Sequence, residues 1–189
     1  MSDSIWTATL ANFRDRVAGI EPVPAGVTAA AVSATLGFGL LTKVLEIASK
    51  RKDFAGDRNL VSALLADARG KSQTLSQLAD EDIAAFHQYL DCLRQKQPLE
   101  AAIRRAIEVP LNVASIAASG VEICEKVTGL VHAFVAPDVR TAAALLMAAV
   151  RSTLQTVEFN LQQLSEDDPY RGEVRAELTR LSQQFRADR

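Results

Sequence analysis

The chain has 189 residues, a net charge of −2 and 48% apolar residues. This length allows one domain with a substantial core, and the composition is that of a globular protein, which excludes a disordered or fibrous chain. Lysine and arginine are spread along the sequence, so no basic patch indicates a nucleic-acid partner. We expect a single domain over residues 1–189.

An uncharged run over residues 22–42 is long enough to raise the question of a membrane span. Its helical part begins only near Gly26, is rich in small and hydroxyl side chains, and ends at Lys43. We therefore expect a buried core helix and no membrane partner. The first nineteen residues carry charges and no apolar signal-peptide core, which predicts a cytoplasmic protein.

Helical periodicity covers nearly the whole sequence, and strand signals are almost absent. The first expected helix opens at Ser2 or Ser4 and ends near Val17. The following helices are expected over residues 26–51, 57–94, 98–131 and 139–164, with a short charged helix at the end of the chain. Pro98 is expected in the first turn of the fourth helix, and Asp138 is expected to cap the fifth. These elements predict an all-α fold, a bundle of about six helices.

Small side chains are concentrated in the second, fourth and fifth expected helices, in the stretches AAAVSATLGFG, VASIAASG and RTAAALLMAA. Alanine and glycine let helix backbones approach closely. The pattern indicates either tight packing within one bundle or a homodimer formed through helices, and the sequence leaves both alternatives open.

Familiar catalytic motifs are absent: the chain has no P-loop, no HExxH and no nucleophile elbow. Its two cysteines, Cys92 and Cys124, lie in helical segments and form no CxxC or His/Cys cluster. We expect two buried thiols in a reducing compartment, and no metal site.

The most unusual feature is a carboxylate that shares a helix face with aromatic side chains. Asp82 lies four residues before Phe86 and seven before Tyr89, so the three side chains share one helix face. An aspartate on the apolar side of a helix has its ionised form disfavoured by desolvation, which raises its pKa toward the range useful for proton transfer. The alternative is that Asp80, Glu81 and Asp82 form a solvated acidic face.

Two other segments have a structural and a functional interpretation. Lys50, Arg51 and Lys52 end the second helix, where they complement the helix dipole or hold an anionic ligand tail. The loop over residues 21–26, with two prolines and a glycine, is either a hinge or the wall of a ligand site. Asn160, on the fifth helix, suggests no role from its position alone.

Taken in order, these features resemble one family. They are a Pro-x-Pro-small-Gly loop opening an Ala/Gly-rich helix, a basic end to that helix, then the motifs Asp-x-x-Ala-Phe and Val-Pro-Leu, a later Asp at a helix start, and Arg-Ser before a final Asn. The order resembles the cyclodeaminase/cyclohydrolase family of folate one-carbon enzymes, which includes methenyltetrahydrofolate cyclohydrolase and the cyclodeaminase domain of formiminotransferase-cyclodeaminase. The resemblance spans residues 6–163, and the ordered set carries it rather than any one motif.

The resemblance implies an all-α homodimer that acts on a folate-type small molecule without a metal or redox cofactor. It implies that Asp82 is catalytic, moving a proton as water opens the methenyl ring. It implies substrate-binding roles for Pro24, Ala25, Gly26, Lys50, Lys52, Asp138 and Asn160, with Lys50 or Lys52 meeting the glutamate carboxylates. The alternatives are a formiminotetrahydrofolate cyclodeaminase, a non-catalytic pterin-binding or protein-interaction relative, and a helical scaffold without a ligand site.

The chain departs from the family in the proline loop. Family members read Pro-x-Pro-Gly-Gly-Gly there, whereas this chain has Ala25 and Val27 on either side of Gly26. Three glycines would permit positive φ angles and let a flat ligand lie against bare backbone, and the two side chains restrict both. Arg140 also stands where the family commonly has a small residue. We therefore expect a reshaped pocket, a different pterin carrier or a loss of catalysis.

Overall fold

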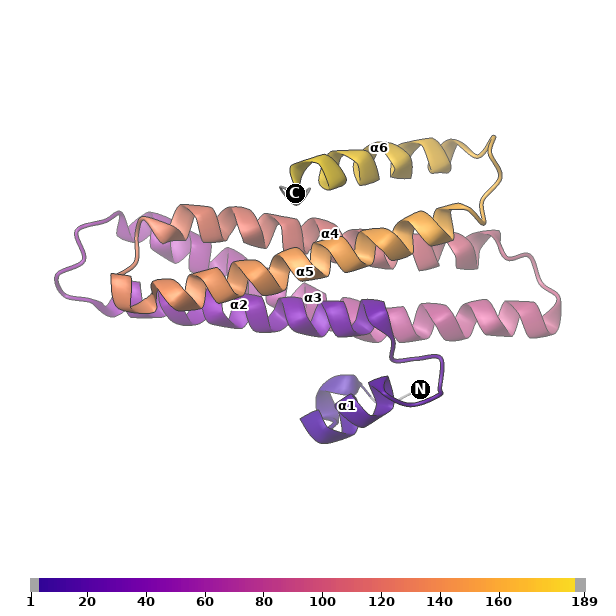
Figure 1. Cartoon of the computed structure of the whole chain (residues 1–189), viewed down its shortest axis with the longest axis horizontal. Helices are drawn as coiled ribbons and strands as arrows, with labels where there is room; N and C mark the ends of the chain where they lie inside the picture. The colour runs from indigo at the N-terminus through magenta and orange to yellow at the C-terminus, as the bar shows by residue number, and fades with distance from the viewer. Residues whose placement is uncertain (1–3, 186–189) are drawn as a thin grey trace.

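Four long helices form an antiparallel bundle in the computed structural model, which describes residues 4–185 (Figure 1). They are α2 (Gly26–Lys50), α3 (Arg58–Gln95), α4 (Glu100–Thr128) and α5 (Ala136–Leu161). Helices α2 and α4 each pack against both α3 and α5, which closes a ring around one core. Helix α6 (Pro169–Gln184) lies against α5 and α4, while the 3-10 turn η1 (Ile5–Thr7) and α1 (Leu10–Val17) lie beside the bundle (Figure 1). The described residues include no strand, and the all-α prediction is confirmed.

Close helix approach in the core depends on small residues. The side chains of Phe38 on α2 and Leu146 on α5 are fully buried, and both contact the position of Gly120 on α4. A Cβ atom at Gly120 would lie 2.7 Å from Cζ of Phe38 and 2.9 Å from Cδ1 of Leu146. Glycine is therefore required here by packing, and the tight-bundle interpretation of the small residues is correct for this position.

The helix starts differ in how their free amides are satisfied. Asp57 caps α3, because its Oδ1 accepts from the amides of Asn59 and Leu60 at 2.8 and 3.2 Å. Helix α2 has no such cap, since Ala25 precedes it and offers no polar side chain.

The N-terminal segment does not form the single helix that was expected. Ala8 and Thr9 are extended, with ψ angles of 153°, and they separate η1 from α1. The Thr9 hydroxyl accepts from the amide of Asn12 at 3.1 Å, so a local N-cap starts a new helix where the apolar spacing predicted continuity. Ser2, one of the two expected starts, lies outside the described residues.

Two expected helix starts are wrong, one by two residues and the other by three. Helix α4 begins at Glu100 after Leu99, so Pro98 precedes the helix instead of occupying its first turn. Helix α5 begins at Ala136 directly after the turn η2 (Ala133–Val135), and Asp138 lies inside its first turn rather than capping it. An acidic side chain there still suits the positive end of the helix dipole.

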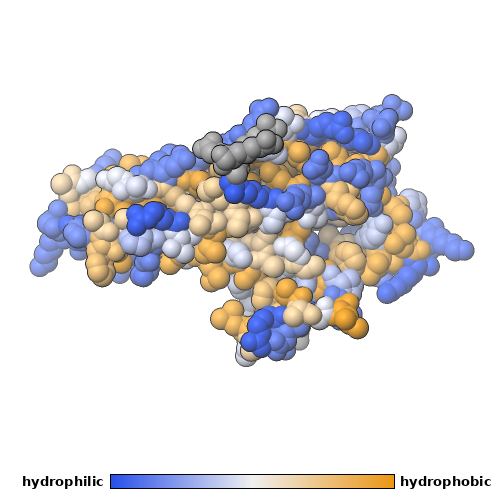
Figure 2. All heavy atoms as spheres, viewed as in Figure 1, coloured by the Kyte–Doolittle hydropathy of each residue, from blue (hydrophilic) through white to orange (hydrophobic). Residues whose placement is uncertain are grey.

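Helices α2 and α4, and the segment Ala133–Leu161, are long and apolar enough by length and composition to cross a membrane. In this structure the apolar side chains of α2 and α4 supply half of the buried residues in the main core cluster. The segment that contains α5 differs, because only 33% of its most apolar stretch is buried. Figure 2 shows weakly hydrophobic side chains over the middle of α5 and α2, between the charged ends of the molecule.

Candidate functional site

A cavity of about 620 Å³ lies where the start of α2 meets α3, α4 and the last turns of α5. Its lining is predominantly apolar and aromatic, with a few polar groups. The lining residues are Pro22, Val23, Ala25, Gly26, Val27, Asp82, Ala85, Phe86, Tyr89, Ile103, Ala106, Thr156, Phe159, Asn160 and Gln163. Concave, mostly apolar cavities with few convergent polar groups are typical of small-molecule sites.

Asp82 is the only charged side chain among these lining residues. It is half-buried on α3, and its Oδ2 accepts a hydrogen bond from the hydroxyl of Thr28 on α2 at 2.6 Å. Burial raises the pKa of the Asp82 carboxyl above its ordinary value, while the hydroxyl and backbone amide of Thr28 partly oppose that rise. The neighbouring acids are engaged elsewhere: Asp80 accepts from Ser4, and Glu81 pairs with Arg105.

The proline loop forms one wall. Ala25 and Gly26 of this loop line the cavity, while Pro24 is buried and does not. Ala25 has φ −131° and ψ −151°, an extended conformation open to any residue, and no described glycine has a positive φ. The expected need for glycine conformational freedom is therefore absent here. Val27 adds a nearly buried side chain to the same wall.

Polar side chains of α5 and aromatic side chains complete the opposite wall. Asn160 donates from Nδ2 to the main-chain carbonyl of Ala106 on α4 at 2.8 Å. The Tyr89 hydroxyl lies 3.4 Å from Oε1 of Gln163. Phe159 is 66% exposed although it lines the cavity, so its ring is available to cover a planar ligand.

The structure thus brings Ala25, Gly26, Asp82 and Asn160 around one cavity, whereas Pro24 does not line it. This juxtaposition joins residues from α2, α3 and α5 that are as much as 135 positions apart in sequence, from Ala25 to Asn160.

Lys50, Lys52 and Asp138 do not line this cavity. Lys50 ends α2, which places it about 36 Å along the helix axis from Gly26 at 1.5 Å per residue. Nζ of Lys50 lies 3.3 Å from Oε2 of Glu46, and Oδ2 of Asp138 lies 2.8 Å from Nζ of Lys43. All of these residues belong to the opposite end of the bundle.

Sequence reasoning did not identify Thr28, Gln163 or Phe159 as part of the site. Gln163 follows Asn160 by three residues and so shares its helix face, a signal that the spacing already contained. Thr28 carried no such signal, because its partner Asp82 comes from another helix.

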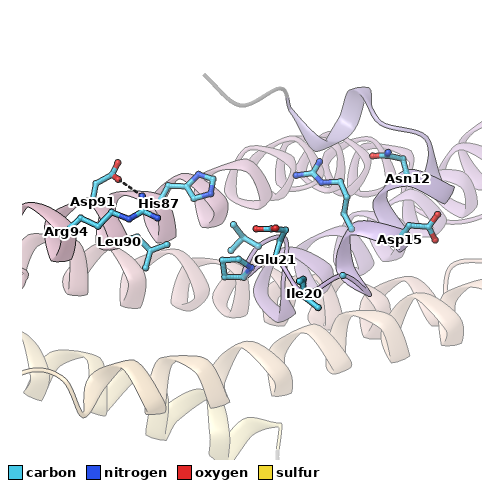
Figure 3. A pocket seen from close by; sticks show the side chains of 12 residues that line it. Asn12, Asp15, Ile20, Glu21, His87, Leu90, Asp91 and Arg94 are labelled. Carbon is cyan, nitrogen blue, oxygen red and sulfur yellow. Dashed lines mark hydrogen bonds and ion pairs between the residues drawn. The ribbon is translucent and has the colours of Figure 1, made fainter.

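A second cavity, of about 880 Å³, lies between the N-terminal segment and α3 and shares Pro22 and Val23 with the first (Figure 3). Its lining includes charges of both signs, among them an ion pair between Asp91 and Arg94 at 3.4 Å, drawn as a dashed line in Figure 3. Among the residues described, no group of three or more His, Cys, Asp or Glu side chains is arranged to hold a metal ion.

The fold and the cavity define a class of protein. The sequence model of the family described as formiminotransferase-cyclodeaminase matches residues 9–180, so this chain belongs to that family. The resemblance inferred from the ordered motifs is confirmed.

Particular relatives are distant in sequence. The chain is 22% identical over 169 residues to a methenyltetrahydrofolate cyclohydrolase of Methylorubrum extorquens, which covers 84% of this chain and 81% of that protein. It is 25% identical over 192 residues to the formimidoyltransferase-cyclodeaminase of Sus scrofa, which covers 96% of this chain but only 35% of the pig protein. The crystal structure of formiminotetrahydrofolate cyclodeaminase from Thermotoga maritima matches with a TM-score of 0.88 and 23% identity, over 96% of this chain and 91% of that one. At that identity, the structural match establishes the shared fold.

Proposed function

We propose that the protein is a methenyltetrahydrofolate cyclohydrolase, which opens 5,10-methenyltetrahydrofolate to 10-formyltetrahydrofolate. Family membership and the bacterial cyclohydrolase among its relatives support this choice of chemistry. The observation that carries the proposal is Asp82, a carboxylate with a raised pKa in an apolar cavity large enough for a pterin.

The proposed reaction needs one group that accepts and returns a proton. Water forms a C–O bond to the amidinium carbon while Asp82 takes a proton from it, which gives a neutral carbinolamine. The bond between that carbon and N5 then breaks, and N5 receives the electron pair and the proton held by Asp82. The carbinol O–H proton leaves to solvent as the formyl C=O forms, so one proton is released per turnover.

The absorbance decay of methenyltetrahydrofolate tests this function. Wild type should outpace the buffer blank, and Asp82→Asn should lower kcat by at least about a hundredfold if Asp82 is the general base. Asp80→Asn is the matched control, because Asp80 lies two residues away on α3 and bonds to Ser4 outside the cavity. A wild type no faster than buffer would rule out the hydrolytic function, and an unimpaired Asp82→Asn would remove Asp82 from the catalytic role.

The alternative reaction is the cyclodeaminase reaction, in which a formimino group closes with loss of ammonia. The name of the pig relative supports it. Ammonia release from formiminotetrahydrofolate, measured beside the hydrolytic rate on one enzyme preparation, separates the two. Folate-dependent thermal stabilisation with neither activity would instead support a non-catalytic pterin-binding relative.

We also propose a homodimer formed through α5. The apolar stretch containing α5 is mostly unburied within one chain, and its exposed residues include the small Ala144 and Ala148. A partner packed along this surface would bury that area. Because Lys50 and Lys52 lie at the far end of α2, they would reach substrate carboxylates only from the second chain of such a dimer.

Mixing inactive variants tests the shared site. Asp82→Asn chains and Lys50→Ala/Lys52→Ala chains are unfolded, mixed in equal amounts and refolded together. The mixture should regain about a quarter of wild-type activity, because half of the dimers contain one chain of each kind and each of these carries one intact site of two. No recovery from two variants that both form dimers would contradict the role of these lysines across the interface.

We further propose a cytoplasmic location, which the two unpaired cysteines support.

A further inference from the structure

Thr28 is the only described residue that donates a hydrogen bond to the Asp82 carboxylate. The threonine is the third residue of α2 and is fully buried, and its β-branched side chain leaves few rotamers for the hydroxyl. Its Oγ1 lies 2.6 Å from Oδ2 of Asp82, a short distance of the kind found for hydroxyl donors to carboxylates. The other oxygen of Asp82, Oδ1, receives no side-chain hydrogen bond from residues 4–185, so it can still accept from a ligand or from water.

The Thr28–Asp82 pair lies in the first turn of α2, a helix that has no side-chain cap of its own. Ala25 offers no side-chain acceptor, and the Asp82 carboxylate from α3 lies at the buried third residue of α2 instead. The Thr28 backbone amide favours the ionised carboxylate together with the hydroxyl. One interaction therefore joins the two helices and fixes one oxygen of the carboxylate.

We propose that Thr28 is a positioning residue for the reaction: it holds Oδ2 of Asp82 so that Oδ1 faces the substrate in the ionised, proton-accepting form. This inference rests on the proposed function, in which Asp82 is the general base. Thr28 touches no reacting atom in this proposal and acts only through Asp82.

Other charged groups do not account for the shifted pKa of Asp82. The lining residues contributed by α2, α4 and α5 are uncharged, and Tyr89 is the other titratable side chain in the cavity. On α3, Asp80 is bonded to Ser4 and Glu81 to Arg105. The pKa of Asp82 is therefore set by two opposing effects: burial raises it, and the hydrogen bonds from Thr28 lower it.

The pH profile of kcat for Thr28→Val and Thr28→Ser tests this role. Valine keeps the branched shape but lacks the hydroxyl, so the pKa of Asp82 rises and the acid limb of the profile moves to higher pH. At a pH on that limb kcat should fall about tenfold, the size expected for losing one hydrogen bond to a charged group, with KM little changed. Serine keeps the donor and should leave kcat within about threefold and the limb in place.

A double-mutant cycle gives a readout that does not depend on activity. The free energies of unfolding of Thr28→Val, Asp82→Asn and the double variant should be non-additive, because the two side chains are in direct contact. A wild type without activity would refute the proposed function, yet the cycle would still report the contact. An active Thr28→Val with an unmoved acid limb would overturn the positioning role and leave Thr28 a purely structural residue.

Discussion

Asn160 on α5 donates a hydrogen bond from Nδ2 to the main-chain carbonyl of Ala106 on α4, and both residues line the cavity. The carbonyl oxygen can only accept, which fixes the orientation of the carboxamide. The bond joins the two helices at the cavity wall and leaves Oδ1 of Asn160 as the atom able to accept from a ligand.

Asn160→Ala should therefore weaken substrate binding. The variant loses an acceptor in the cavity and also leaves the Ala106 carbonyl without this donor. We expect KM for methenyltetrahydrofolate to rise about tenfold with a smaller change in kcat, as for a group that binds substrate and transition state alike. Steady-state kinetics checks this, and Gln155→Ala, an exposed change on the same helix outside the cavity lining, is the control. A kcat loss with unchanged KM would refute the binding role.

Asp82→Asn should stabilise the protein near neutral pH while it removes activity. The folded-state pKa of Asp82 lies above the ordinary aspartate value of 3.8, so between the two values the folded state binds more protons than the unfolded state. Stability therefore falls as pH rises through that window, and at higher pH wild type carries the full cost of a buried charge. Asparagine avoids this cost and still accepts from Thr28.

Urea unfolding at a series of pH values measures the effect as the difference between variant and wild type. The advantage of Asp82→Asn should be present at neutral pH and should disappear below pH 3.8, where Asp82 is protonated in both states. Asp80→Asn should instead lower stability, since the Asp80 carboxylate accepts from Ser4 Oγ at 2.6 Å and from the Ile5 amide at 3.0 Å. A destabilised Asp82→Asn at neutral pH would mean that the contacts of the ionised carboxylate with Thr28 outweigh the cost of burying its charge.

The helices and their packing follow from signals that are local in sequence. Apolar spacing near 3.6 residues and the Asp57 cap place α3 within one residue of its expected bounds. The break at Thr9 was missed, because a local side-chain cap there outweighs apolar spacing that would also suit a continuous helix.

The site was predictable only where its residues follow from helix faces or from the family resemblance. Asp82 was found because its spacing to Phe86 places both on one face, and both line the cavity. The positions of Lys50 and Gly26 at opposite ends of one helix could have been derived from the length of α2 alone. The hydrogen bond from Thr28 to Asp82 could not have been derived from the sequence, since it depends on how α2 packs against α3.

Gly120→Ala should destabilise the bundle. The new Cβ would lie 2.7 Å from the Phe38 ring and 2.9 Å from Leu146, and both side chains are fully buried. Overpacking of this kind costs about 1–3 kcal/mol of unfolding free energy. Gly70→Ala is the matched control on α3, because its Cβ would meet nothing within 4 Å and alanine favours a helix by up to ~1 kcal/mol. Urea unfolding at one protein concentration should place the two variants on opposite sides of wild type.

The two cysteines should differ in reactivity. Cys124 is buried on α4, and burial raises the pKa of its thiol to about 12, so it stays protonated and inaccessible. Cys92 on α3 is half-buried. An aromatic disulfide reagent at pH 8 should label one thiol per native chain and two after unfolding, and Cys92→Ser should abolish the native reaction. Labelling of native Cys92→Ser would show that α4 opens to solvent.

The proline loop gives a pair of variants with opposite expected effects on substrate binding. Ala25 has ordinary extended backbone angles, so Ala25→Gly relieves no strain and removes only a methyl group from the cavity wall. We expect KM for methenyltetrahydrofolate to fall, with a stability cost of about 0.5–1 kcal/mol from the freer unfolded chain. Gly26→Ala adds a methyl group that meets no protein atom within 4 Å, so the fold accepts it and the cavity narrows. The KM of Gly26→Ala should rise, and its free energy of unfolding should be unchanged or slightly higher than that of wild type. Equal KM values for the two variants would mean that no substrate ring lies against this loop.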